Sequence, residues 1–200
     1  MRKQIFALIL ILMLVCTSSI SIQEAKSAAA TVPLSITVNG ALVVSDADND
    51  IMAGENPTKN VSLSITPDLG QTVQSGSANF RVRTNKTTWR LTAQRTASDA
   101  GGTGLADSDV KVDIAKSAGT SANSDAGSLV APFTAQTSLA SIDTAMAVDV
   151  INGTAKTSSA RNNANDQNWF QVNTTYSLEP DFFYEPGTFS STITYSLVSP

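Results

Sequence analysis

Apolar and polar residues alternate with a period of two along much of this chain, and this pattern constrains the fold more than any other feature. In NFRVRT (79–84), Phe80 and Val82 alternate with two arginines, and the closing stretch TFSSTITYSLVSP (188–200) alternates in the same way. Successive side chains of a β-strand point to opposite faces of its sheet, whereas a helix repeats every 3.6 residues. The pattern therefore predicts strands with one face in a core and the other in water.

The alternating stretches are separated by segments rich in Gly, Ser, Asn and Asp, which favour turns and loops. Asn39-Gly40 is the strongest hairpin signal, because both residues tolerate the positive φ of a type I′ turn. Strands are expected at residues 33–38, 41–45, 60–66, 79–84, 87–95, 109–115, 147–151, 168–178 and 188–200.

Three stretches of small polar residues separate some of these strands, at 96–109, 116–141 and 152–168. Such segments bury too little apolar surface to offset their ordering entropy, so we expect long surface loops, with one short helix near 138–148. Short strands joined by polar loops are typical of two packed antiparallel sheets. The predicted fold class is all-β, an antiparallel β-sandwich with long polar loops.

The chain begins with Arg2 and Lys3, followed by the apolar run IFALILILMLVC (5–16). A positive start, about a dozen apolar residues and a later small-residue site are typical of a secretory signal peptide. A membrane-spanning helix needs ~20 apolar residues. We expect cleavage after Ser27, with residues 28–30 as alternative sites.

This interpretation predicts a signal peptide at 1–27, a single β-sandwich domain at 28–200 and a secreted, extracellular cell-surface location. A retained N-terminal anchor is one alternative, and a lipid anchor on Cys16 is another. Val15 precedes this cysteine where lipoprotein processing requires a small residue, which argues against the lipid.

Charge and cysteine content exclude several function classes. Removal of the leader leaves 173 of the 200 residues and changes the net charge from −4 to −6, because three of the 13 Lys and Arg residues and one of the 17 acidic residues are lost. Nucleic acids and anionic membranes attract basic surfaces, so neither is an expected partner after signal cleavage.

The chain has no histidine, and its one cysteine, Cys16, lies in the leader. Ser-His-Asp and Cys-His catalysis therefore lack a base or a nucleophile, and zinc lacks its preferred ligands. We expect a non-enzymatic protein with no cofactor.

The stretch SDADNDIMAGE (45–55) is the one metal-like motif. Asp46, Asp48 and Asp50 match the first three ligands of a calcium loop. Ile51 stands where such a loop needs glycine, and Pro57 where it needs a bidentate glutamate. We therefore expect an acidic, solvated connection and no metal site.

Two aromatic-x-leucine motifs occur, Trp89-Arg90-Leu91 in mid-chain and Tyr195-Ser196-Leu197 near the end. Together with Phe189, Ile193 and Pro200, their order and spacing resemble the proximal and distal motifs of the WxL domain. The chain departs from that pattern at Tyr195, where the distal motif has Trp, at Phe189, where it has Tyr, and at Pro200, which comes one residue early. The resemblance implies an exported domain that attaches non-covalently to the Gram-positive cell wall, with peptidoglycan or other surface proteins as partners.

A second resemblance competes with the first. The turn Glu185-Pro186-Gly187, followed by an aromatic residue and an alternating C-terminal strand, is similar to fimbrial and spore-coat-U-type subunits. That resemblance implies self-association, in which an N-terminal segment such as ATVPLSITV (30–38) fills the groove of the next subunit. Strand donation supplies both hydrogen bonds and apolar side chains to an incomplete sandwich.

The motif residues also have a purely structural interpretation. In a β-sandwich, Trp89 and Leu91 are expected to pack in the core, and Phe189, Ile193, Tyr195 and Leu197 to line one inner face. The candidate residues are thus structural or wall-binding. The function we expect is cell-surface adhesion through a WxL-like wall-attached domain, with a fimbrial-like, self-assembling pilus or coat subunit as the alternative.

Overall fold

The computed structural model describes residues 35–38, 40–46, 57–67, 69–159 and 168–200. The chain divides into two compact units, residues 1–38 and 39–200, which are described separately. In the first unit, the described residues 35–38 belong to no strand, and the side chains of Ile36 and Val38 are 76% and 81% exposed. The predicted signal peptide lies outside the described residues.

The second unit contains nine strands and one 3₁₀ helix in its described part. Their bounds are Leu42–Asp46 (β1), Gln74–Thr84 (β2), Trp89–Arg95 (β3), Lys111–Ala118 (β4), Gly127–Leu129 (β5), Thr137–Ser138 (β6), Leu139–Ser141 (η1), Val148–Gly153 (β7), Phe170–Leu178 (β8) and Ile193–Val198 (β9).

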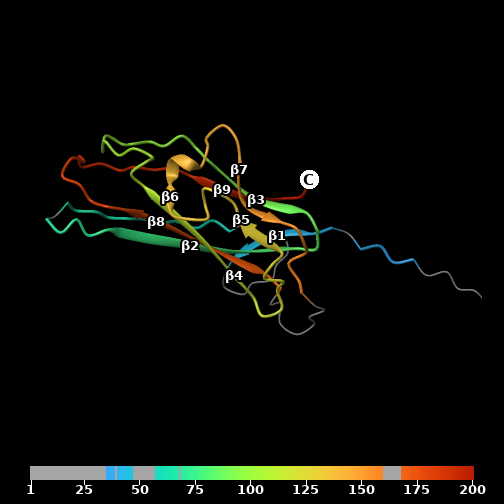
Figure 1. Ribbon diagram of the computed structural model, residues 1–200. Coiled ribbons are helices and arrows are strands. Elements are labelled where there is room, and N and C mark those ends of the chain that lie inside the picture. The colour runs from blue at the N-terminus through green and yellow to red at the C-terminus, as the bar shows by residue number, and fades with distance from the viewer. Residues whose placement is uncertain (1–34, 39, 47–56, 68, 160–167) are drawn as a thin grey trace, which may run out of the picture. The chain divides into compact units, whose positions relative to one another are not determined.

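The strands form two antiparallel sheets that pack face to face (Figure 1). The five-stranded sheet has the order β1-β2-β8-β4-β6, and the four-stranded sheet has the order β5-β7-β3-β9. The predicted antiparallel β-sandwich is therefore confirmed. No helix in the described part of the chain has the length and apolar character of a membrane span.

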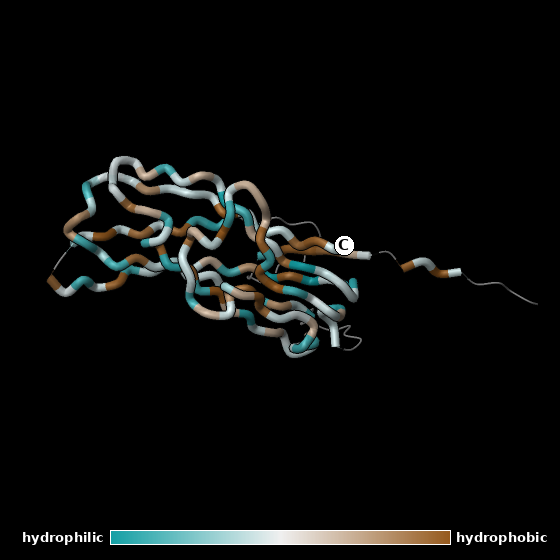
Figure 2. The backbone as a smooth tube through the Cα atoms, turned by 45° about the horizontal axis from the view of Figure 1, so that its top comes forward, coloured by the Kyte–Doolittle hydropathy of each residue, from teal (hydrophilic) through white to brown (hydrophobic). Residues whose placement is uncertain are grey.

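Alternation along the strands builds the core between the sheets, and Figure 2 shows apolar and polar residues following one another along the strand backbones. In β8, Phe170 and Val172 are fully buried, whereas the intervening Gln171 is half-buried. The buried core consists of Phe80, Val82, Trp89, Leu91, Ala93, Val110, Val112, Ile114, Ala126, Phe133, Leu139, Ile142, Val150, Ile151, Phe170 and Val172.

Most of the predicted strands are present. The predictions at 41–45, 79–84, 87–95, 109–115, 147–151, 168–178 and 188–200 overlap β1, β2, β3, β4, β7, β8 and β9. The predicted helix near 138–148 is limited to the single turn η1.

Two strand predictions were wrong in the described residues. Residues 60–66 alternate in burial as a strand would, yet they belong to no strand, and neither do residues 35–38 of the predicted strand 33–38. Alternation sets which side chains turn inward, but a strand also needs a backbone neighbour in register. Asn39, of the predicted hairpin turn, lies outside the described residues.

Two strands and the first part of a third were not predicted. β5 and β6 lie inside the segment 116–141, which was expected to be a loop, and β2 begins at Gln74, five residues before the predicted start. The added part of β2 reads QSGSA, and it is a strand because it pairs in register with β8, from Gln74 opposite Leu178 onward.

Candidate functional site

Trp89, the first residue of β3, lies fully buried in a slot made by two glycines. Trp89 pairs with Gly153 of β7, and Gly127 of β5 pairs with the same glycine. A Cβ added to Gly153 would lie 2.0 Å from Cε2 of the indole ring, and one added to Gly127 would lie 2.7 Å from Cη2. Neither position therefore has room for a side chain beside this ring.

The indole nitrogen of Trp89 is also satisfied inside the protein. Its Nε1–H donates a hydrogen bond of 2.7 Å to the backbone oxygen of Ala155, and the ring lies 6.2 Å from that of Phe170. A buried indole needs such a partner, and here the protein supplies it. Trp89 is a core residue in this structure, and its ring presents no surface to a ligand.

The proximal and distal motifs meet on neighbouring strands. Antiparallel pairing of β3 with β9 places Leu91 opposite Leu197 and Ala93 opposite Tyr195. Leu91 is fully buried, whereas the distal-motif side chains are half-buried and pack against the rim of the core. These half-buried residues are Phe189, Ile193, Tyr195 and Leu197.

Tyr195 links the two sheets through its hydroxyl group. The hydroxyl oxygens of Tyr195 and Tyr176 of β8 are 3.1 Å apart, and the ring of Tyr195 lies 5.1 Å from that of Phe80. Burial raises the pKa of Tyr195 well above its ordinary value of 10.0, and the neighbouring Tyr176 adds to that rise. The protonated phenol is therefore the form that suits this position.

One side of the sandwich is open at the backbone level. β9 is the last strand of its sheet and pairs only with β3 among the described strands. In the facing sheet, β1 pairs with β2 only over Phe80–Thr84, so the first half of β2 (74–79) has β8 as its only strand neighbour in the described chain. β1 and β9 are in contact, so both free edges border the same side of the sandwich.

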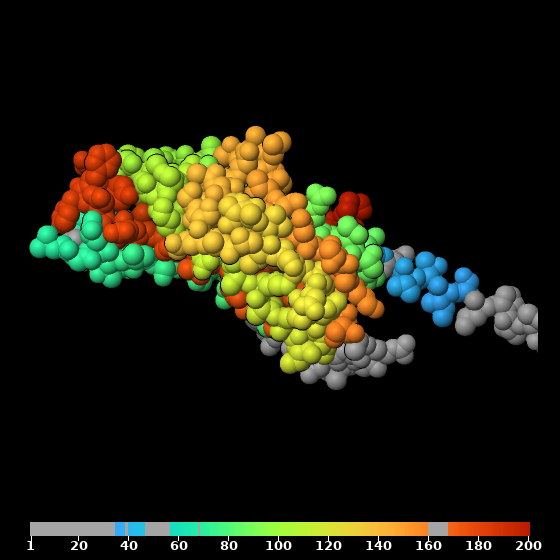
Figure 3. Space-filling view, viewed as in Figure 1, coloured from blue at the N-terminus to red at the C-terminus, as the bar shows by residue number. Residues whose placement is uncertain are grey.

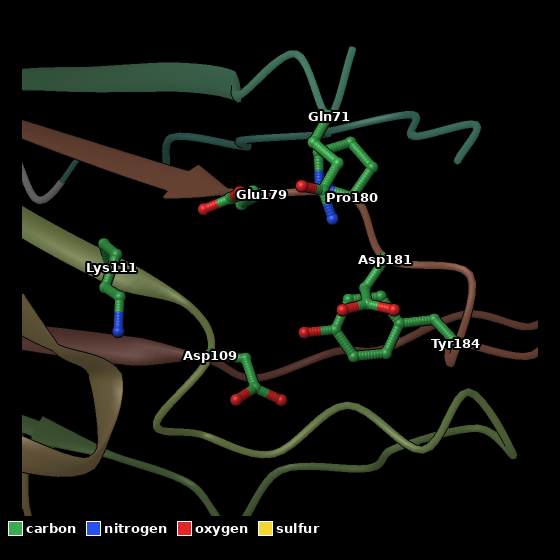
Figure 4. A pocket seen from close by; sticks show the side chains of 7 residues that line it. All are labelled: Gln71, Asp109, Lys111, Glu179, Pro180, Asp181 and Tyr184. Carbon is green, nitrogen blue, oxygen red and sulfur yellow. The ribbon is translucent and has the colours of Figure 1, made fainter. Parts of the chain in front are cut away.

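A polar cavity of about 270 Å³ lies at one end of the same sandwich (Figure 4). It is lined by Gln71, Asp109, Lys111, Glu179, Pro180, Asp181 and Tyr184. The loops around residues 70 and 182 form the protein surface at this end, as Figure 3 shows in teal and red. Within the described residues, no group of three or more acidic, histidine or cysteine side chains is placed to hold a metal ion.

Two of the three carboxylates that line this cavity accept hydrogen bonds from the backbone of local turns. Asp181 Oδ1 accepts a hydrogen bond of 2.8 Å from the backbone N–H of Phe183, and Asp109 Oδ2 accepts one of 2.9 Å from that of Ala106. Burial raises the pKa of Tyr184, and the nearby Asp109 carboxylate raises it further. These two aspartates therefore have a structural role in the turns that border the cavity. Asp48 and Asp50 of the calcium-like stretch lie outside the described residues.

The glycine slot was not predicted from the sequence, and the strand-donation alternative implied an incomplete sandwich without locating its open side. Gly127 and Gly153 become notable only through the register of β5, β7 and β3, which no local motif encodes. Comparison of the chain with family models, curated proteins and solved structures gives no match.

Proposed function

We propose that this protein is an exported, non-enzymatic surface protein that self-assembles by strand addition at the open side of its sandwich. The observation that carries the proposal is a combination of complementary features. Among the described strands the sandwich has unpaired edges, and the described segment 35–38 of the separate N-terminal unit has the exposed apolar residues Ile36 and Val38.

Strand addition explains both features physically. An edge strand presents free N–H and C=O groups that an extended chain can pair with, and alternate side chains of that chain then cover the exposed rim of the core. Here the rim consists of half-buried residues of β9, including Ile193, Tyr195 and Leu197. A segment with an apolar residue at every second position fits such a surface.

Deletion of residues 28–38 tests this proposal. The chain from Ala28 onward is expected to form oligomers or fibres, detected by light scattering after size-exclusion chromatography and by electron microscopy. The chain without residues 28–38 is expected to stay monomeric with an unchanged β-sheet circular dichroism spectrum. Equal assembly of both chains would contradict strand donation.

A second candidate function is non-covalent wall attachment of the WxL type. The pairing of Leu91 with Leu197 favours it, because the two motifs of the resemblance lie side by side on β3 and β9. Because these side chains lie in or against the core, exposed residues around them, such as Arg90 and Val198, would make the contact with the wall.

Sedimentation with purified peptidoglycan separates the two functions. Wall attachment predicts that the protein co-sediments whether or not residues 28–38 are present. Assembly without wall affinity predicts that the protein stays in the supernatant when it is kept below the concentration at which it assembles.

A further inference from the structure

Residues 57–66 lie against the open half of β2 without forming a strand with it. Val61 Cγ1 and Leu63 Cδ2 would lie 2.8 Å and 3.1 Å from a Cβ placed on Gly76. Gly76 shares its face of β2 with the buried residues Phe80 and Val82, because all three are separated by even numbers of residues. The side chains of Val61 and Leu63 therefore cover the inner face of the sheet beyond the end of β1.

The 57–66 segment continues the line of β1 along β2. Asp46, the last residue of β1, pairs with Phe80, and the Lys59 ammonium forms an ion pair with the Asp46 carboxylate. From Lys59 to Leu63 the chain thus advances from the level of Phe80 to the level of Gly76, antiparallel to β2, and Figure 1 shows the segment beside that strand. These contacts place the segment along β2 beyond the end of β1.

Side chains rather than a backbone ladder keep the segment in place. Val61, Leu63 and Ile65 are half-buried and alternate with exposed neighbours. No backbone–backbone hydrogen bond joins residues 57–66 to another part of the described chain. An element with few buried contacts and no ladder opens at a lower free energy than a paired strand.

The same apolar pattern occurs a second time in the chain. Residues 32–38 read VPLSITV and residues 61–67 read VSLSITP, so the two heptapeptides share Val, Leu, Ser, Ile and Thr at matching positions. The described part of the first copy is exposed, with Ile36 and Val38 in solvent. The two segments can therefore offer the same side chains to the same surface.

We propose that residues 57–66 are a placeholder segment, which covers part of β2 until the 32–38 segment of a second copy of the chain displaces it. This inference rests on the proposed assembly function. The incoming segment adds the backbone ladder that the placeholder lacks, with Gln74–Asn79 as its partner strand.

Chain direction identifies a second copy as the donor. Residues 32–38 lead into β1, whose first residue, Leu42, pairs with Thr84 at the far end of β2. To reach Gly76 while β1 remains paired, the segment of the same chain would have to run parallel to β2, opposite to the placeholder. A second copy can enter antiparallel to β2, in the direction of the placeholder itself.

A labelled synthetic peptide of residues 30–38 tests the proposal by fluorescence anisotropy with the chain from Ala28 onward. The double variant Val61→Asp/Leu63→Asp removes the apolar anchors of the placeholder, and we expect it to bind the peptide at least tenfold more tightly than the unchanged chain. Ser62→Asp/Ser64→Asp is the matched control, since both serines are exposed in the same segment. We expect the control to bind as the unchanged chain does.

A reversible lock provides the complementary test. Val61→Cys/Gly76→Cys places two thiols within disulfide reach, and the expected exported chain has no other cysteine. We expect the oxidised protein to lose peptide binding and assembly, and dithiothreitol to restore both. Gly76→Cys alone should show no redox dependence.

The outcomes separate this inference from the function on which it rests. Failure of the peptide to bind any variant, reduced or oxidised, would contradict strand acceptance itself. Equal binding to the locked, unlocked and unchanged chains would retain strand acceptance and overturn the placeholder, since the peptide would then add at another edge such as β9. If Val61→Asp/Leu63→Asp loses its β-sheet circular dichroism spectrum, the comparison of oxidised and reduced Val61→Cys/Gly76→Cys still tests the proposal.

Discussion

β3 and β9 are paired strands with similar sequences, yet their side chains have different environments. β3 lies between β7 and β9, and its inward residues Trp89 and Leu91 are fully buried. Among the described strands, β9 has only β3 as a neighbour, and Leu197 is half-buried although it pairs with the fully buried Leu91; Tyr195, opposite the buried Ala93, is half-buried as well. Position within the sheet, rather than the local sequence, determines how much of each side chain leaves water.

The comparison teaches that the two aromatic-x-leucine motifs have different physical roles. The proximal motif completes the interior of the sandwich, while the distal motif lies on the last strand of its sheet, whose outer edge pairs with no other strand of the described chain. An unpaired edge next to half-buried apolar residues can pair with an added strand, as we propose for this protein. Substitutions in the closed and open regions should therefore differ in their cost to stability.

Trp89→Ala is expected to have the largest effect. Removal of a fully buried indole loses its burial and leaves a cavity, which costs about 3–5 kcal/mol of unfolding free energy. Urea titration followed by far-ultraviolet circular dichroism measures this loss. A cost below about 1 kcal/mol would contradict the assignment of Trp89 to the core.

Leu91→Ala and Leu197→Ala compare the two regions directly at one paired position. Leu91→Ala is expected to cost about 2–5 kcal/mol, because its side chain is fully buried. Leu197→Ala is expected to cost about 1–2 kcal/mol, because water already reaches part of its side chain. The same urea titrations give both values, and equal costs would show that the β9 side is closed in solution.

Gly153→Ala tests the slot that accommodates the indole ring. The added methyl group would lie 2.0 Å from ring atoms of Trp89, so the ring or the strand must shift, at a cost of about 1–3 kcal/mol. A double-mutant cycle with Trp89→Leu isolates the contact. We expect the glycine substitution to cost less in the Trp89→Leu background, and an additive result would show that the two residues do not interact.

Sequence reasoning predicted the sandwich because period-two alternation survives in β3, β4 and β8, where one face is apolar and the other polar. It could not predict the first half of β2, since QSGSA has no apolar signal and becomes a strand only by pairing with β8. It also assigned a strand to residues 60–66, whose alternation is real but whose backbone has no strand partner within the described part of the chain. Strand pairing depends on register across the whole sheet, which local pattern does not contain.

The arrangement of the candidate site also depends on strand register, which the local pattern does not contain. The sequence gives the order of the two motifs along the chain, and their side-by-side arrangement on β3 and β9 needed the register of Leu91 with Leu197. The slot glycines and the open edge have no local signature at all. Both are properties of how distant segments lie together, so they emerged only with the structure.

Tyr195→Phe tests the polar link between the two sheets and is expected to have the smallest effect. Loss of the hydroxyl contact with Tyr176 should cost about 1 kcal/mol at neutral pH. A second consequence follows from linkage. The pKa of Tyr195 is raised in the folded protein, so the unfolded chain loses this proton at a lower pH. The stabilisation that this group contributes to the folded state is therefore lost as the pH rises above the ordinary value of 10.0.

Urea titrations between neutral and alkaline pH measure this dependence. The unchanged protein should lose stability steeply once the pH passes the ordinary tyrosine pKa, and Tyr195→Phe should lose it less steeply, because the substituted ring has no proton to release. Tyr184→Phe is the matched control: its pKa is also raised, but it lies in the solvent-facing end cavity, so its effect on the slope should be smaller. Identical alkaline slopes for the unchanged protein and Tyr195→Phe would show that water reaches this hydroxyl, and the open side would then extend inward to β8.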